Sequence, residues 1–281
     1  MNDVSYEAWV GKCETVADVI TPWPIIALSA TLDRDDPQPK DGDPVPPGWH
    51  WIYFLEAKRA RELGHDGHPK RGGFLPPVAL PRRMWAGGRI EFIQPIRIGT
   101  AVQRKSEILS VERKQGASGE LVFVTVRHVI SGAEGPAICE EHDIVYRSAA
   151  RPGDPPPKTK AAPARATWHH ALTADAVILF RYSALTFNGH RIHYDLDYVR
   201  QEENYPGLIV HGPLQTTLLL ELCRNHDQRP IRRFDYRALH PVFHTERFTV
   251  NGILSADGTS ASLWTANAAG NVAMSATAHF A

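Results

Sequence analysis

Residues 213–225 read PLQTTLLLELCRN, and this stretch decides how the surrounding chain folds. Pro213 can begin a helix, because proline is tolerated in the first turn, where its missing N–H has no helical partner. Leu214, Leu218 and Leu222 recur at every fourth position and would share one face of that helix. The stretch therefore predicts a largely buried, central helix.

Four runs rich in β-branched and aromatic residues follow this helix, and turn signals such as Asp257-Gly258 separate them. The expected strands cover residues 234–239, 246–254, 260–267 and 272–280. Upstream, residues 175–182 are apolar enough for a helical turn or a short strand. This order predicts a helix laid on an antiparallel sheet.

The first half of the chain repeats the same order of elements. A helical stretch is expected over residues 49–63, and four strands are expected over residues 89–93, 101–112, 121–131 and 137–147. Residues 88–96 also line up with 234–242, and both carry a proline, Pro95 or Pro241, that would end strand pairing. The shared order indicates an α+β protein made by duplication.

The two halves are separated by residues 149–165, AARPGDPPPKTKAAPAR, which lack apolar periodicity and are typical of a linker. We therefore expect domains at residues 1–148 and 166–281, each large enough to bury its own core.

Composition narrows the classes of partner. Lys plus Arg and Asp plus Glu number 31 each, so no bulk positive charge favours nucleic acid or an anionic membrane. No run of about 18 apolar residues suits a bilayer span, and the first residues do not resemble a signal peptide. Cys13, Cys139 and Cys223 are far apart and are expected to be reduced, buried thiols. We expect a cytoplasmic protein with a small-molecule partner.

Residues 185–195, LTFNGHRIHYD, form a polar segment just before the central helix. With the duplicated order of helix and strands, this segment resembles the double hotdog fold of the MaoC-like hydratase family. The family signature is Gly-Asp-x-Asn-Pro-(Leu/Ile/Val)-His-x-Asp. His193 takes the place of the signature histidine and Asn188 that of the first aspartate, while His190 and Arg191 replace the usual Asn and Pro.

Two further stretches strengthen the resemblance. Residues 206–214, PGLIVHGPL, look like the Val-His-Gly stretch that leads into the family's central helix. Residues 81–92, PRRMWAGGRIEF, are closer to one branch, the mesaconyl-C4-CoA and itaconyl-CoA hydratases and the related mitochondrial-type hydroxyacyl-thioester dehydratases. The resemblance implies a hydro-lyase that adds water to an enoyl-CoA, with no cofactor. A possible homodimer also follows from the family.

Such a reaction needs a base for water, an acid for the α carbon and donors for the enolate oxygen. A histidine can exchange protons near neutral pH, so His193 is the expected general base. Asn188 can position water or thioester but cannot accept a proton, so His193 carries both transfers or is helped by His190 or Asp195. By resemblance, the oxyanion site is at the helix start beside Gly212, and since Pro213 has no N–H, the donor is Gly212 or a residue from Leu214 onward.

Substrate contacts are expected from His190, His211, Arg191 and Arg89. The arginines are candidates for a free carboxylate on the acyl group, because guanidinium binds carboxylate through two bonds. The spacing His190, His193 and Asp195 lacks the pattern of a metal site, so no metal is expected.

The first half lacks a histidine segment of this kind and is expected to accommodate the acyl chain. The most specific hypothesis is hydration of itaconyl-CoA or mesaconyl-C4-CoA to citramalyl-CoA. Dehydration of (3R)-hydroxyacyl thioesters, a thioesterase that uses Asp195, and a non-catalytic acyl-thioester binding module are the alternatives.

Overall fold

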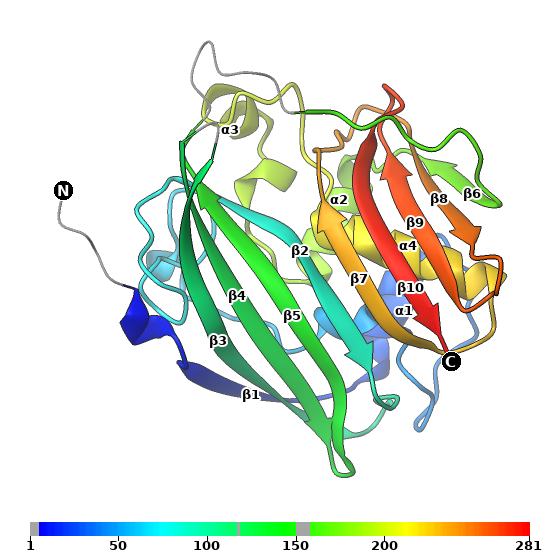
Figure 1. Ribbon diagram of the computed structural model, residues 1–281. Helices are drawn as coiled ribbons and strands as arrows, with labels where there is room; N and C mark the ends of the chain where they lie inside the picture. The colour runs from blue at the N-terminus through cyan, green and yellow to red at the C-terminus, as the bar shows by residue number, and fades with distance from the viewer. Residues whose placement is uncertain (1–5, 117–118, 150–157) are drawn as a thin grey trace.

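The computed structural model describes residues 6–116, 119–149 and 158–281. In these residues ten strands form one antiparallel sheet in the order β1-β3-β4-β5-β2-β7-β10-β9-β8-β6 (Figure 1). The strands are β1 Cys13–Val19, β2 Arg82–Phe92, β3 Ala101–Gly116, β4 Gly119–Gly132, β5 Gly135–Arg147, β6 Trp168–Leu172, β7 Ile231–Ala238, β8 Phe248–Leu254, β9 Ser260–Ala266 and β10 Val272–Phe280.

This strand order is symmetric about the junction of β2 and β7, where the two halves of the chain meet. Arg89 of β2 pairs with Asp235 of β7, and these residues also correspond in the sequence repeat. A residue that pairs with its own counterpart lies next to an approximate two-fold axis. The predicted duplication is therefore visible in the sheet itself.

The longest helix is α4, Gly212–His226, which confirms the predicted central helix. Figure 1 shows α4 behind β7, β10 and β9, and its contacts with β8, β9 and β10 agree. Its buried face is wider than one leucine stripe and includes Leu219, Leu220 and Cys223.

The other helices are shorter: α1 Pro22–Thr31, α2 Ala176–Leu185 and α3 Leu196–Gln201. The short 3-10 turns are η1 Glu7–Trp9, η2 Trp49–Ile52, η3 Ala60–Glu62 and η4 Arg191–His193.

The prediction of a helix over residues 49–63 is wrong, since this stretch forms two short 3-10 turns, η2 at its start and η3 near its end, and no α-helix. Phe54 has a left-handed backbone, φ 56°, and donates its N–H to the Asp18 carboxylate of β1 at 2.7 Å, which ends helical bonding. Residues 55–62 are exposed and bury no apolar face. Trp49 instead donates its indole N–H to Glu221 of α4 at 2.8 Å. Helix α4 of the second half thus holds the start of the first-half segment, residues 49–63, in which the predicted helix does not form.

Four elements were not predicted: β1, β6, α1 and α3. Strand β6 has five residues and α3 has six, too few for a clear period. Helix α1 contains Pro22 and Pro24 in its first turn, where proline is tolerated. The ambiguous residues 175–182 belong to α2, which Asp175 caps by accepting the N–H groups of Val177 and Ile178.

The largest apolar cluster combines both halves, with Ile90 and Ile138 from the first and Leu214 and Phe234 from the second. The halves therefore share their largest cluster, while a second buried cluster, which includes Ile108 and Val124, lies in the first half alone. Part of the predicted linker, residues 150–157, lies outside the described residues.

The three cysteines differ in burial. Cys13 is exposed and Cys139 is half-buried, so of the three only Cys223 is buried as expected. Among the described residues no helix is long and apolar enough to cross a membrane.

Candidate active site

A cavity of about 1100 Å³ lies between the two halves of the molecule. The first half contributes β2, β5 and the loop before β2, and the second half contributes η4, the start of α4 and β7. Five of the residues predicted from the sequence line it: Asn188, His190, His193, Gly212 and Arg89. The segment 185–195 and the helix start thus do meet at one site, as expected.

His193 lies at the wall of this cavity with its ring fixed on two sides. Its Nδ1 donates to the carbonyl oxygen of Ile209 at 2.7 Å, and its ring stacks on His211 with centroids 3.6 Å apart. Burial lowers the pKa of His193 to about 4, against the opposing effect of the Ile209 hydrogen bond. The imidazole is therefore neutral at pH 7, and Nε2 is its proton acceptor.

His211 is the N-cap residue of α4 and lies behind His193, fully buried and outside the residues that line the cavity. Its Nε2 bonds Ser183 of α2 at 2.8 Å. Burial and the neighbouring His193 hold the pKa of His211 well below its usual value. The predicted substrate contact is not formed by this geometry, and His211 supports the ring of His193 instead.

Asn188 shapes the loop that carries His190. Its Oδ1 accepts the backbone N–H of His190 at 2.9 Å, and its own N–H donates to Ser183 at 2.8 Å. The side-chain amide therefore has its Nδ2 donors left for a ligand. Burial and the neighbouring His68 lower the pKa of His190, which is neutral at pH 7 as well.

Gly212 is the first residue of α4, where backbone N–H groups have no helical acceptor. Within the described residues, its N–H donates to no protein acceptor. A Cβ at this position would lie 2.8 Å from the Trp85 ring of β2, so only glycine lets the two halves approach this closely. The helix start thus offers an open donor and a positive dipole to the cavity.

The arginines expected to bind a substrate carboxylate already have acidic partners. Arg191 binds Asp195 through Nε and Nη2, at 3.0 and 2.7 Å, and does not line the cavity. Asp195 also caps α3 by accepting the N–H of Tyr198. Arg89 lines the cavity but its Nη1 binds Asp143 at 3.1 Å and its Nε binds Glu141 at 2.7 Å. The geometry therefore favours neither arginine as the receptor, and Asp195 is not at the site.

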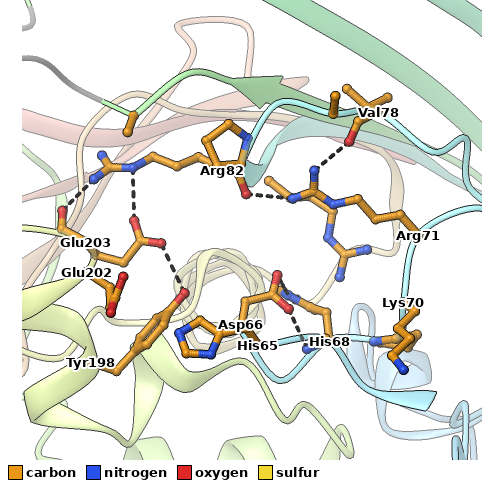
Figure 2. A pocket seen from close by; sticks show the side chains of 16 residues that line it. His65, Asp66, His68, Lys70, Arg71, Val78, Arg82, Tyr198, Glu202 and Glu203 are labelled. Carbon is orange, nitrogen blue, oxygen red and sulfur yellow. Dashed lines mark hydrogen bonds and ion pairs between the residues drawn. The ribbon is translucent and has the colours of Figure 1, made fainter. Parts of the chain in front are cut away.

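A histidine and an aspartate that were not predicted reach the same cavity from the first half. Figure 2 shows Asp66 directed at His68, whose Nδ1 lies 3.1 Å from Asp66 Oδ2. The ring of His68 lies 4.0 Å from that of His190. Burial and Arg83 lower the pKa of His68 to about 4, against the effect of Asp66, and the hydrogen bonds from His68 lower the pKa of Asp66.

A smaller cavity of about 560 Å³ adjoins the main one (Figure 2). The two cavities share Asp66, His68, Pro81, Arg82, Arg83 and Glu203. Arg82 is held by Glu203, whose Oε2 lies 3.1 Å from its Nε. Arg83 forms no ion pair with any carboxylate of the described residues. It is the half-buried cation on the wall common to both cavities.

Among the described residues, two groups of side chains could hold a metal ion, and the ligand atoms of each group lie within 4.8 Å of one another. Asp66, His68 and His190 form one group at the cavity. His128, Glu140 and His142 form the other in the first half, where Glu140 also accepts from the indole of Trp51 at 2.9 Å. Imidazole and carboxylate suit several transition metals, so the donor sets fit such an ion chemically.

Comparison with known proteins finds relatives that are named as hydratases or dehydratases. Residues 48–244 match the family described as hydroxyacyl-thioester dehydratase type 2. The chain is 46% identical to mesaconyl-C(4)-CoA hydratase of Chloroflexus aurantiacus, over 88% of this chain and 89% of that protein. It is 27% identical to the mitochondrial hydroxyacyl-thioester dehydratase type 2 of Schizosaccharomyces pombe, over 80% and 85% of the two chains.

Among solved structures, a MaoC-like dehydratase from Phytophthora capsici superposes with a TM-score of 0.66 at 13% identity and covers 96% of each chain. At this identity the likeness concerns the fold alone. It confirms the double hotdog fold expected from the sequence.

Proposed function

The chain belongs to the hydroxyacyl-thioester dehydratase type 2 family and is a hydro-lyase of enoyl-CoA thioesters, and on this premise we propose that its substrate is a branched dicarboxylic enoyl-CoA. Itaconyl-CoA and mesaconyl-C4-CoA are the candidates, and hydration of either would give citramalyl-CoA. The likeness to the Chloroflexus hydratase over nearly the whole chain supports this substrate class.

One observation carries the mechanism: a neutral histidine faces the cavity next to an unpaired helix-start N–H. The bond from His193 Nδ1 to Ile209 leaves Nε2 as the acceptor, and Gly212 lies on the same cavity wall. His193 takes a proton from water as the oxygen bonds to the β carbon. In mesaconyl-C4-CoA, whose double bond is conjugated with the thioester, the electron pair of that bond moves to the thioester oxygen, which the Gly212 N–H stabilises as an enolate. His193 then returns its proton to the α carbon.

Asn188 positions the reactants and does not exchange protons. Its Nδ2 donors are directed by the bond that fixes Oδ1 on the backbone of His190. An amide in this place can hold the thioester or the attacking water but cannot become charged during the reaction.

Arg83 is proposed as the receptor for the free carboxylate of the acyl group. It is half-buried, lines both cavities and has no carboxylate partner among the described residues, whereas Arg89 and Arg191 are each paired. A half-buried cation that lines a cavity without a carboxylate partner can bind an anion, and a carboxylated substrate would supply that anion. The roles earlier expected of Arg89 and Arg191 therefore pass to Arg83.

The first half is proposed to enclose the acyl chain. Its apolar contributions to the cavity come from Leu75, Met84, Trp85, Phe123 and Val145. These side chains face the catalytic segment of the second half across the cavity. Residues 49–63 form no central helix in the first half, and this leaves room for the acyl group on that side of the cavity.

A second candidate is reversible dehydration of (3R)-hydroxyacyl thioesters on CoA or on acyl carrier protein. The family description and the similarity to the yeast protein favour it. The same His193 and Gly212 would serve this reaction, since hydration and dehydration share one transition state. The two candidates differ in the substrate, and Arg83 favours the carboxylated one.

A panel of thioesters tests the proposal. The purified protein is incubated with mesaconyl-C4-CoA, itaconyl-CoA and crotonyl-CoA, and the enoyl absorbance and free thiol are followed together. The proposal expects loss of the double bond without thiol release, and a higher kcat/KM for a dicarboxylic substrate than for crotonyl-CoA. Preference for crotonyl-CoA would favour the second candidate, and thiol release would indicate a thioesterase. The expected cytoplasmic location and homodimer stay predictions.

A further inference from the structure

The catalytic segment lacks one group that the reaction needs. Attacking water is best held through both of its hydrogens, so that an oxygen lone pair faces the β carbon. His193 Nε2 provides one acceptor. Asn188 Oδ1 already accepts the backbone N–H of His190, and Asp195 caps α3 and does not line the cavity. From outside this segment, Asp66 and His68 line the same cavity, and the His68 ring lies 4.0 Å from that of His190 in the catalytic segment.

The loop that carries Asp66 and His68 is fixed against the catalytic segment. The N–H of Arg191 donates to the carbonyl oxygen of Asp66 at 2.9 Å. Gly67 has φ 85°, and a Cβ on it would overlap the carbonyl oxygen of Gly189. The Gly64 N–H donates to the His68 carbonyl at 2.7 Å and closes the loop. His68 is thus held in place by contacts between the two halves.

The Asp66 carboxylate also fixes which nitrogen of His68 carries the proton. Its Oδ2 lies 3.1 Å from Nδ1, and its Oδ1 accepts the backbone N–H of His68 at 3.1 Å. A carboxylate only accepts hydrogen bonds, so Nδ1 of His68 carries the hydrogen and Nε2 is an acceptor. His193 has the same tautomer because of the Ile209 carbonyl. Two neutral imidazoles therefore present acceptor nitrogens at one cavity.

We propose that His68, oriented by Asp66, is a second catalytic residue that binds the attacking water together with His193. This assignment rests on the proposed hydration. One hydrogen of the water bonds to Nε2 of His193 and the other to Nε2 of His68. The first O–H bond breaks as oxygen bonds to the β carbon, and that proton passes through His193 to the α carbon. The second hydrogen stays on the product hydroxyl, which His68 holds. Atoms and charge balance without a co-reactant.

The charges around His68 agree with an acceptor role. Burial and the Arg83 guanidinium disfavour the imidazolium, so His68 is neutral at pH 7 despite Asp66. Asp66 keeps its negative charge, because its pKa is lowered by the bonds from His68. Asp66 is a positioning residue, whereas His68 contacts the reacting water. The second half alone does not contain the complete site.

His68→Ala tests the assignment in the full-length enzyme. We expect kcat to fall at least about 100-fold with little change in KM, which is the usual size of a lost acid or base contact. His65→Ala is the matched control, since this histidine lies in the same loop but packs on Tyr198 and does not line the main cavity. The control should keep wild-type kcat. A kcat loss in His68→Ala below about 10-fold would overturn the assignment.

Asp66→Asn covers the case in which His68→Ala does not fold. This near-isosteric change lets the His68 tautomer reverse, so we expect kcat to fall at least about 10-fold with an unchanged Tm. Imidazole ¹⁵N NMR of the wild type at pH 7 should show hydrogen on Nδ1 of His68 and an unprotonated Nε2, and Asp66→Asn should mix the tautomers. Equal spectra and equal kcat in both proteins would contradict the proposal.

These measurements distinguish a failure of the proposed hydratase function from a failure of the role proposed for His68. If the wild type hydrates no enoyl-CoA, the proposed function fails, and the tautomer measurement still reports on Asp66 and His68. If the wild type is active and His68→Ala is equally active, the role of His68 fails alone.

Discussion

His193 combines features that favour a base rather than a structural histidine. Its Nδ1 is occupied by Ile209, its ring is stacked on His211, and its remaining nitrogen faces a large cavity. The residue therefore has a defined tautomer and one nitrogen available for chemistry.

Arg83→Gln should weaken binding of dicarboxylic substrates selectively. Loss of a charged hydrogen bond of about 1.5–3 kcal/mol predicts a KM for mesaconyl-C4-CoA that rises at least about 10-fold. Crotonyl-CoA has no carboxylate and serves as the internal control, with a change below about 3-fold. Steady-state kinetics on both substrates measures the effect. An equal rise for the two substrates would remove Arg83 from carboxylate recognition.

Metal removal should not affect the reaction, because the proposed water is held by imidazole nitrogens. We expect kcat after exhaustive dialysis against a chelator to equal that of the untreated enzyme. The relevant donors are Asp66, His68 and His190, whose ligand atoms lie within 4.8 Å of one another. Loss of activity that Zn²⁺ restores would show that these residues bind a metal, and that the water is activated there instead.

The sequence was informative for residues that lie in one continuous motif. Asn188, His190, His193 and Gly212 were found because their spacing resembles a family signature, and all four line the cavity. Asp66 and His68 come from a distant loop with no secondary-structure period, so their proximity depends on how the halves dock. The sequence did not reveal that Arg89 and Arg191 pair with Glu141 and Asp195, because these partners are identified only by the folded geometry.

At the scale of elements, the loop before β2 has to approach the catalytic segment very closely. Gly67 permits this approach through its left-handed backbone and its missing side chain. The loop has little regular structure of its own, and contacts to Arg191 and Gly64 fix it. The position of this loop therefore depends on a few individual residues and not on regular secondary structure.

Gly67→Ala should displace this loop and lower kcat at least about 10-fold, because a left-handed alanine costs roughly 1–2 kcal/mol even before the overlap with Gly189. Gly73→Ala is the control in the same loop, since a Cβ there meets no atom within 4 Å. Kinetics and Tm of the two variants are compared. Wild-type kcat in Gly67→Ala would show that the loop does not contribute to catalysis.

Strands and the central helix were predictable where the pattern was regular, and β10 matches its predicted bounds fully. The helix expected over residues 49–63 failed because a tertiary bond from Phe54 to Asp18 replaces helical bonding there. Strand β2 begins at Arg82, earlier than predicted, since Gly87 and Gly88 weaken the strand pattern although Tyr236 packs against them.

At the scale of the whole molecule, the two halves form one sheet, one main core and one cavity. Pairing of β2 with β7 joins them at the approximate two-fold axis. The second half supplies His193 and Gly212, and the first supplies Arg83 and His68. Duplication thus produced two different halves that build a single site.

The buried histidines predict how the stability of the molecule depends on pH. The pKa values of His68 and His193 fall to about 4, and that of His128, buried beside His142, falls to about 3. Unfolded histidines bind protons below about pH 6.5, so the unfolded state gains protons first as pH falls. Stability should therefore decrease from pH 6.5 toward pH 4, by up to about 1.4 kcal/mol per pH unit for each group.

Tm measured between pH 7.5 and about pH 4.5 checks this dependence, which should be shallower in His128→Gln. Glu140 and Asp66 have lowered pKa values, so each stabilises the folded state at neutral pH. This stabilisation is lost only as the pH falls below the pKa of an unfolded carboxyl, which is more acidic than the range in which the histidines act. A Tm that stays constant from pH 7 to pH 5 would contradict the buried, neutral histidines.

The most direct test compares wild type and His193→Ala on mesaconyl-C4-CoA, with enoyl absorbance and free thiol recorded in the same reaction. His170→Ala, a change on the exposed side of β6, is the control. The account predicts that wild type and control remove the double bond without releasing thiol, and that His193→Ala loses about 100- to 10,000-fold in kcat. Hydration by His193→Ala within about 10-fold of the wild-type rate would place the catalytic base elsewhere.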